Sequence, residues 1–326
     1  MRNADRFVTL GAAVVLLAPL AACSDAGLVA EDADDFPSEE MRMIIPYAPG
    51  GLTDTAGRAL AEFYEKELDQ TVVVENLPGG SSSVGMTELL TSDPDGHTIA
   101  MGTVGSFALT PQLQDLDYNH ENVAYVGLAA RAPGVLAVNA DSEYETAEDF
   151  FEAAEDDPGA LNVAVPGAST PTAMELRRMS DDHGVELTAV PFDGDAEAAG
   201  ELLGGNVDAL SDPLTDVIRQ PIEEGDLRAL AVIDEERSDL LPDTPTLEEL
   251  GYDGLTLGIS TWGPVVHADT PPEITEKLET SLEAAYDDPE FREQIGEEYI
   301  PKEFIDGADY QEQVEEAADI YAPMVD

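Results

Sequence analysis

The sequence predicts an α/β protein, because apolar strand-like runs alternate with amphipathic helical patterns along most of the chain. After their first residue, the runs Thr71–Val74 and Arg228–Ile233 are wholly apolar, which is typical of strands buried on both faces of a largely parallel sheet. The chain has 326 residues, of which 43% are hydrophobic, so it is long enough for two domains with a full core.

The expected elements follow one another in regular order. We expect strands at 43–47, 71–76, 98–103, 123–129, 134–139, 161–166, 187–192, 207–210, 227–233 and 257–266. We expect helices at 55–68, 83–90, 147–155, 173–182, 196–203, 215–224, 272–287, 290–298 and 310–321. The extended run 123–139, broken by Pro133, is a candidate crossover between two domains, and 227–233 is the candidate return.

The N-terminus has the pattern of a secretory signal. Arg2 and Arg6 precede the apolar run 7–22, which is shorter than the roughly 20 residues of a membrane span. The signal peptide is therefore expected at 1–22. It ends at Leu20–Cys23, which looks like a bacterial lipobox with Cys23 as the lipidated residue; the alternative is a chance cysteine after a secretory signal. Residues 23–40 would then form an acidic tether.

The net charge of −56 excludes nucleic-acid binding, which needs a basic surface. The acidic residues are spread along the chain and lysine occurs at only three positions. This pattern favours a protein adapted to high salt, where charges are screened. The alternative is an ordinary acidic secreted protein.

The first candidate site is the loop PYAPGGLTD. Gly50 and Gly51 would let a ligand approach the backbone, and a helix beginning near Thr55 would present its N–H groups to an anion. Thr53 or Asp54 could cap that helix, and Asp54 is the better cap than ligand because like charges repel. The alternative is a tight turn. The candidate residues of this loop are Tyr47, Pro49, Gly50, Gly51, Thr53 and Asp54.

Further polar loops also stand between a strand and a helix, where ligands of open α/β sheets bind. The candidates in these loops are Ser81, Ser82, Thr103, Ser106, Gly167, Ser169 and Thr170. Lesser candidates are Phe192, Asp212 and Trp262, for which core, helix-start or hinge positions are the alternatives. We expect no metal and no cofactor, because the histidines lack a zinc spacing and no GxxxxGK[ST] loop is present.

Eight segments occur in an order and spacing that identify a family. They are 46–54, 72–85, 92–103, 132–139, 158–167, 190–194, 202–210 and 225–251. From about residue 43 onward, the chain resembles the tripartite tricarboxylate transporter substrate-binding proteins, also called Bug proteins. Many relatives carry a histidine near Thr172, where this sequence departs from them.

The resemblance implies a type II periplasmic-binding-protein fold with two α/β lobes, a hinge and a cleft. We place lobe 1 at 41–135 and 234–326, and lobe 2 at 136–233. It further implies a monomeric, non-enzymatic, extracytoplasmic receptor that passes a small carboxylate to large and small membrane transporter subunits. A carboxylate sensor is one alternative. A hydrolase using Ser81–Ser83 or Ser169 is another, but no base-and-acid arrangement is evident in the sequence.

Overall fold

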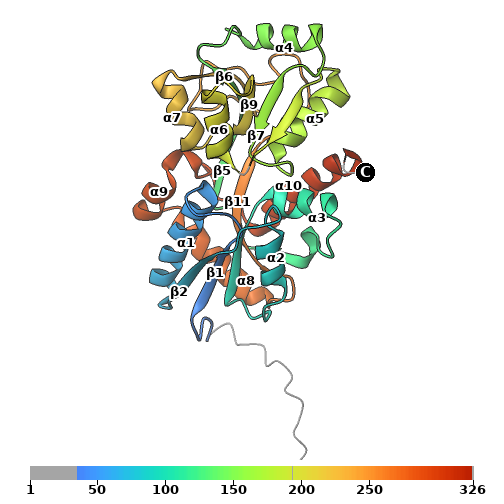
Figure 1. The fold of residues 1–326 in the computed structure, drawn as a ribbon. Helices are drawn as coiled ribbons and strands as arrows, with labels where there is room; N and C mark the ends of the chain where they lie inside the picture. Colours follow the sequence, from blue (N-terminus) through green and yellow to red (C-terminus); the bar gives the residue numbers. More distant parts are fainter. Residues whose placement is uncertain (1–34, 193, 325–326) are drawn as a thin grey trace, which may run out of the picture. The chain divides into compact units, whose positions relative to one another are not determined.

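The fold is built from two separate β-sheets with helices on both faces of each (Figure 1). A computed structural model describes residues 35–192 and 194–324. The expected signal peptide, Cys23 and most of the expected tether lie outside the described residues. The strands are β1 (Met41–Ile45), β2 (Val72–Asn76), β3 (Thr98–Gly102), β4 (Val123–Tyr125), β5 (Ala130–Ala132), β6 (Gly134–Asn139), β7 (Asn162–Val165), β8 (Thr188–Pro191), β9 (Ala209–Pro213), β10 (Leu227–Ile233) and β11 (Ser260–His267).

Helices connect most of these strands. The α-helices are α1 (Leu52–Leu68), α2 (Ser83–Leu90), α3 (Thr110–Leu113), α4 (Ala147–Asp156), α5 (Pro171–His183), α6 (Asp195–Leu203), α7 (Asp216–Glu224), α8 (Pro272–Ala285), α9 (Pro289–Ile295) and α10 (Gly307–Tyr321). A π-helical turn, η1 (Gly105–Leu109), precedes α3. The α/β prediction is confirmed, and α2 and β10 have the expected bounds.

Local signals explain several helix ends. The Thr146 hydroxyl accepts the N–H of Asp149 at 3.1 Å, and the Asp149 carboxylate accepts the N–H of Thr146, which forms a capping box at the start of α4. Helix α5 begins with Thr170 as N-cap and Pro171 as its first residue, and it ends at Gly184 in the left-handed conformation.

The first sheet has the order β2-β1-β3-β11-β4, and β5 pairs with the start of β11. One face packs against α1, α8 and α9, and the other packs against α2, η1 and α10. The second sheet has the order β10-β6-β9-β7-β8. Helices α4 and α5 cover one of its faces, and α6 and α7 cover the other. Each sheet with its helices forms one lobe.

Both sheets are mixed, so the expectation of largely parallel sheets is wrong. The pairs β1–β2, β1–β3, β7–β8 and β7–β9 are parallel, whereas β6 and β11 pair antiparallel with each of their neighbours. The reason is topological. Strands β6 and β11 each enter a lobe from the other lobe, so they begin at the edge of the sheet that faces that other lobe. Their neighbours run toward this edge, which makes β6 and β11 antiparallel to them.

The crossings between the lobes pack tightly against each other. The first crossing lies at Pro133, between β5 and β6. A Cβ atom on Gly134 would lie 2.8 Å from the Gly258 carbonyl oxygen, and one on Gly258 would lie 2.5 Å from Ile233 Cγ2. Glycine at both positions allows this close approach.

The return to the first lobe comes later than expected. Leu247 and Leu255 are buried in the core of the second lobe, under α4 and α5. The segment after β10 therefore stays with the second lobe until β11 begins at Ser260, instead of leaving it at residue 234. An apolar pattern cannot show against which sheet such a loop packs.

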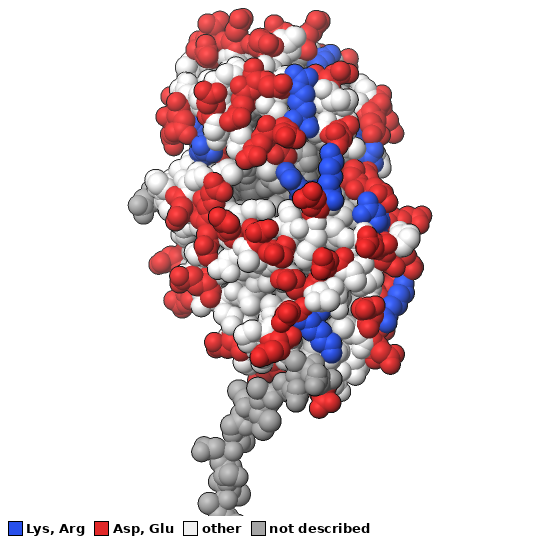
Figure 2. Space-filling model, turned by 180° about the vertical axis from the view of Figure 1, so that it is seen from behind, with Lys and Arg blue, Asp and Glu red and all other residues white. Residues whose placement is uncertain are grey.

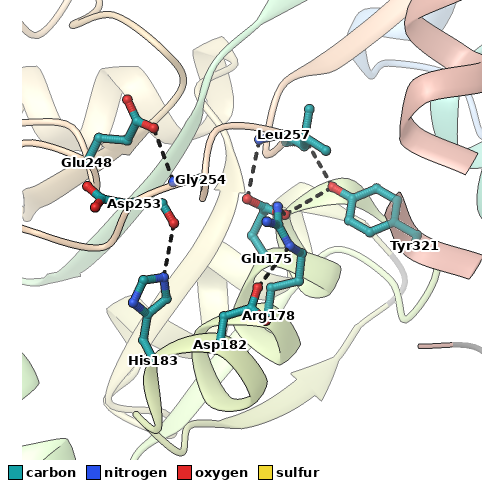
Figure 3. Close-up of polar contacts among 9 residues, drawn as sticks. All are labelled: Glu175, Arg178, Asp182, His183, Glu248, Asp253, Gly254, Leu257 and Tyr321. Carbon is teal, nitrogen blue, oxygen red and sulfur yellow. Dashed lines mark hydrogen bonds and ion pairs between the residues drawn. The ribbon is translucent and has the colours of Figure 1, made fainter. Parts of the chain in front are cut away.

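A buried polar cluster lies where α10 of the first lobe meets α5 of the second (Figure 3). The Tyr321 hydroxyl lies 3.2 Å from Glu175 Oε1 and 3.1 Å from the Leu257 carbonyl oxygen. The Leu257 N–H donates to Glu175 Oε2, and Arg178 pairs with Oε1 at 2.9 Å. Burial raises the pKa of Glu175, although Arg178 opposes this.

The surface is strongly acidic. Figure 2 shows Asp and Glu side chains over both lobes on the face drawn, with few Lys and Arg side chains between them. Within the described residues, no helix has the length and apolar character needed to cross a membrane.

Candidate ligand-binding cleft

A cavity of about 420 Å³ lies between the two lobes. Its walls come from the segments after β1, β3 and β7, from the start of α6 and from β11. The lining residues are Tyr47, Ala48, Pro49, Gly50, Gly51, Leu52, Thr53, Thr103, Val104, Gly105, Pro166, Ser169, Thr170, Pro171, Gly194, Asp195, Ala196, Pro213, Val217, Ser260, Thr261 and Trp262.

Helix α1 opens onto this cavity without a capping side chain. It begins at Leu52, three residues before the expected start, and its N-cap is Gly51, which provides no side-chain acceptor. The expectation that Thr53 or Asp54 caps the helix is therefore wrong. The N–H groups of the first turn and the positive end of the helix dipole are left available to an anion.

Asp54 holds the first loop in place from outside the cavity. Its carboxylate accepts the Gly50 N–H at 3.1 Å, the Asn76 amide at 2.8 Å and the Arg58 guanidinium at 3.0 Å. The Asn76 amide also donates to the Tyr47 carbonyl oxygen. Burial alone would raise the pKa of Asp54, but the bonds from Arg58, Asn76 and Gly50 lower it. Asp54 is thus an ionised brace for the glycine turn.

Three hydroxyl groups form a cluster under the cavity wall. Tyr47 Oη lies 3.3 Å from Thr103 Oγ1 and 3.4 Å from Ser106 Oγ, and the last two atoms are 2.9 Å apart. Tyr47 and Thr103 line the cavity, whereas Ser106 is fully buried behind them. Ser106 can therefore orient the other two hydroxyls but does not form the wall.

The second Gly/Ser loop does not reach the cavity. Ser81 and Ser82 are absent from its lining, and Ser82 is buried. The Ser81 carbonyl oxygen accepts the Thr110 hydroxyl at 2.9 Å, and the Gly80 carbonyl oxygen accepts the Gln114 amide. The loop thus packs against α3. A Gly/Ser composition could not distinguish this support from a ligand loop.

The second-lobe loop after β7 does reach the cavity. Ser169 and Thr170 line it, but Gly167 does not. The Thr170 hydroxyl caps α5 through the Ala173 N–H and also donates to the Gly167 carbonyl oxygen at 3.0 Å. Since Thr170 serves the helix, Ser169 is the freer hydroxyl of this loop.

The lesser candidates have different places. Phe192 packs partly buried under α6 and α7, so it is a core residue rather than part of the wall. Asp212 is completely buried and does not line the cavity. Trp262 lines the cavity while being only 6% exposed, so it belongs both to the wall and to the core.

Sequence reasoning missed several wall residues. Gly105 and Ser260 carry no distinctive motif. Asp195 could have been found, because α6 follows β8 by the same strand–loop–helix pattern as the other loops. Asp195 is also the one charged residue among the described residues that line the cavity.

The lobes approach each other closely at one side of the cleft. A Cβ atom on Gly105, at the start of η1, would lie 2.8 Å from the Ser169 carbonyl oxygen of the second lobe. Only a residue without a Cβ allows this distance.

The chemistry of the wall suits binding better than catalysis. Backbone N–H groups and the hydroxyls of Tyr47, Thr103 and Ser169 can hold an anion. No histidine is among the described lining residues, so neither Ser169 nor Ser260 has an imidazole base beside it.

One possible metal-ligand group lies at the opposite end of the first sheet. A carboxylate oxygen of Glu39, a carboxylate oxygen of Asp95 and a ring nitrogen of His97 lie within 4.8 Å of one another. His97 Nε2 accepts the Ser38 N–H at 3.2 Å, and Nδ1 lies 3.3 Å from the Asp95 carboxylate. Both ring nitrogens of His97 therefore face protein groups.

Comparison with known proteins connects this geometry to a family. The family model described as "Tripartite tricarboxylate transporter family receptor" matches residues 56–324. The Cupriavidus necator protein named "UPF0065 protein in gbd 5'region" is 33% identical over 273 residues, which cover 81% of this chain and 79% of the relative.

Solved structures agree with this match. MatC from Rhodopseudomonas palustris with bound malate has a TM-score of 0.77 at 25% identity, covering 89% of this chain and 100% of its own. Rpa4515 of the same organism, with adipate, has a TM-score of 0.79 at 25% identity, covering 89% of this chain and 97% of its own. The two lobes thus form the predicted periplasmic-binding-protein fold, and the chain belongs to the tripartite tricarboxylate transporter family of extracytoplasmic solute receptors.

Proposed function

We propose that this receptor captures a small organic carboxylate in the cleft and delivers it to the large and small membrane subunits of a tripartite tricarboxylate-type transporter. The receptor itself performs no chemical step on its ligand. MatC and Rpa4515 hold malate and adipate, two small carboxylates, which supports this ligand class.

The observation that carries the proposal is the uncapped start of α1 at the cavity wall. Gly51, Leu52 and Thr53 line the cavity, and Gly51 offers no capping side chain. A ligand carboxylate would supply the missing acceptor for the N–H groups of the first turn. Neighbouring hydroxyls of Tyr47 and Thr103 would complete its hydrogen bonds.

The test is direct binding by the chain without its signal peptide and Cys23, from residue 24 onward, at about 1 M salt, where surface charges are screened. Isothermal titration with a panel of mono-, di- and tricarboxylates should give saturable binding of at least one member with no consumption of ligand. Turnover of the ligand, or folded protein that binds no member of the panel, would contradict the proposal.

We further propose that lipidated Cys23 anchors the receptor to the outer surface of the cell membrane, which suits delivery to a membrane transporter. The motif Leu20–Cys23 supports the anchor. Mass spectrometry of the N-terminal peptide should show a lipid-modified Cys23, and Cys23→Ser should release the receptor into the soluble fraction. An unmodified Cys23 in membrane-free receptor would contradict the anchor.

A further inference from the structure

The start of α6 forms the second-lobe wall opposite the loops of the first lobe. Gly194, Asp195 and Ala196 all line the cavity. Unlike the start of α1, this helix end already holds a carboxylate, because Asp195 is its first residue. The Thr215 hydroxyl also donates to Asp195 at 3.2 Å. A ligand carboxylate would meet a like charge here rather than a free helix end.

A second carboxylate, that of Asp212, is buried in the core of the same lobe. Asp212 is 0% exposed, and neither of its oxygens has a hydrogen-bond partner in the described part of the chain. Leu210, two residues before Asp212 on β9, belongs to the apolar cluster under α6 and α7, so the Asp212 side chain points to the same side of the sheet. The hydrogen bond from Thr215 to Asp195 brings the end of β9 beside the start of α6, so the two acids are near enough to influence each other.

The two carboxylates compete for charge. Burial and the neighbouring Asp195 raise the pKa of Asp212 well above its usual range. Burial also raises the pKa of Asp195, but the Thr215 hydroxyl and the backbone N–H oppose that rise. Asp195 is therefore the better place for the negative charge, and Asp212 is the better place for a proton. The pair places one negative charge at the cavity wall.

Nothing else in the described wall balances this charge, because no Lys or Arg lines the cavity. We propose that the ligand is a zwitterion, whose ammonium group binds Asp195 while its carboxylate binds at the start of α1. This inference rests on the proposed function and narrows its substrate class from carboxylates to amino-group-bearing carboxylates. A ligand that carries both an ammonium group and a carboxylate would be attracted both to Asp195 and to the start of α1.

Matched ligands test the inference on the full mature receptor. Each of succinate, glutarate and adipate is compared with the ω-amino acid in which one carboxylate is replaced by an aminomethyl group: 4-aminobutyrate, 5-aminopentanoate and 6-aminohexanoate. L-Aspartate and L-glutamate add an α-ammonium group to two of these dicarboxylates. We expect the best ammonium-bearing ligand to bind about tenfold or more tightly than its matched dicarboxylate, since it gains one charge-assisted hydrogen bond.

Variants identify the residue responsible. Asp195→Asn and Asp195→Ser should each remove the preference and improve dicarboxylate binding. Asp181→Asn changes charge equally at an exposed site on α5, outside the cavity, and should keep the preference. Circular dichroism checks that each variant is folded, and the serine variant serves if the asparagine variant is not.

The outcomes separate the two levels of the proposal. A receptor that binds dicarboxylates as tightly as their ammonium-bearing partners overturns the zwitterion inference and leaves the carboxylate receptor intact. The same holds if both Asp195 variants keep the parent's preference. Folded receptor that binds no ligand of either kind overturns both.

Discussion

Tyr321 and Glu175 are hydrogen-bonded at 3.2 Å, which joins the last helix of the first lobe to the helix that starts at the cleft in the second. Both side chains are almost completely buried. Tyr321→Phe would remove a donor from a buried carboxylate, and we expect the free energy of unfolding to fall by about 1–3 kcal/mol. Urea-induced unfolding would measure this loss.

A matched variant serves as control for this prediction. The Tyr252 hydroxyl makes no hydrogen bond among the described residues, although its ring packs on Phe151. Tyr252→Phe should therefore change stability by less than Tyr321→Phe. Both substitutions keep the aromatic ring and remove only the hydroxyl group. Equal effects would therefore show that the hydrogen bonds of the Tyr321 hydroxyl add no stability.

The close approach of Gly105 to Ser169 predicts an effect of a single methyl group on lobe closure. A Cβ atom at Gly105 would meet the Ser169 carbonyl oxygen at 2.8 Å, so Gly105→Ala must hold the lobes slightly apart. We expect ligand affinity to fall by about tenfold or more while the melting temperature of the free receptor changes little. Gly200→Ala is the control, because a Cβ there has no neighbour within 4 Å. Unchanged affinity in Gly105→Ala would rule out closure at this contact.

Removing the charge of Asp54 should loosen the first loop. Asp54→Asn loses an ionised acceptor of the Gly50 N–H and should reduce both stability, by about 1–3 kcal/mol, and ligand affinity. Because the folded-state pKa of Asp54 is lowered, its contribution is present above the usual aspartate pKa of about 4 and is lost as the pH falls through the lowered value. The variant should therefore show a smaller loss of stability on acidification than the parent.

Asp69→Asn, at the exposed C-terminal end of the same helix, is the control for this variant. Titration calorimetry and urea unfolding between pH 7 and acid would follow both variants. Parent-like affinity in Asp54→Asn would show that the glycine turn needs no brace.

Asp212 gives the opposite pH dependence. Its pKa is raised in the folded state, so its contribution is present below the usual aspartate pKa of about 4 and is lost as the pH rises through the raised value. We expect Asp212→Asn to be more stable than the parent at pH 7, and this gain to shrink toward pH 4. Melting temperatures across this range would test it, and a gain independent of pH would contradict the assignment to charge.

Salt should stabilise the receptor if its acidic side chains, which give a net charge of −56, repel one another. We expect a melting temperature that is several degrees lower in dilute buffer than at 1 M salt, where the screening length is about 3 Å. Sucrose is the control, since it favours burial without screening charge. If sucrose reproduces the whole effect of salt, or if salt has none, charge repulsion is not the cause.

The alternation of elements could be predicted from the sequence because periodicity is local. Helix α2 and strand β10 have the expected bounds, and the family motifs identified the receptor fold correctly. Strand direction was not accessible in this way. Whether β6 and β11 run with or against their neighbours depends on where the chain enters each lobe, which no local pattern records.

The sequence indicates which loops lie near the cleft, but not which way their individual side chains point. Gly50, Gly51 and Ser169, which we proposed from the sequence, line the cavity. The sequence could not show that Asp54 turns back to the loop or that Ser82 is buried. Asp195 was overlooked because one acid among so many carries little information in this sequence. Its position at the first residue of α6 distinguishes it, and that position becomes visible only with the helix in place.

The bare start of α1 has a consequence for a receptor whose surface is so acidic. Every residue except proline carries a backbone N–H group, so a site made from these groups is unaffected when surface side chains are exchanged for acids. In the proposed function, a ligand carboxylate held by these N–H groups would therefore be unaffected by the number of acidic side chains on the surface.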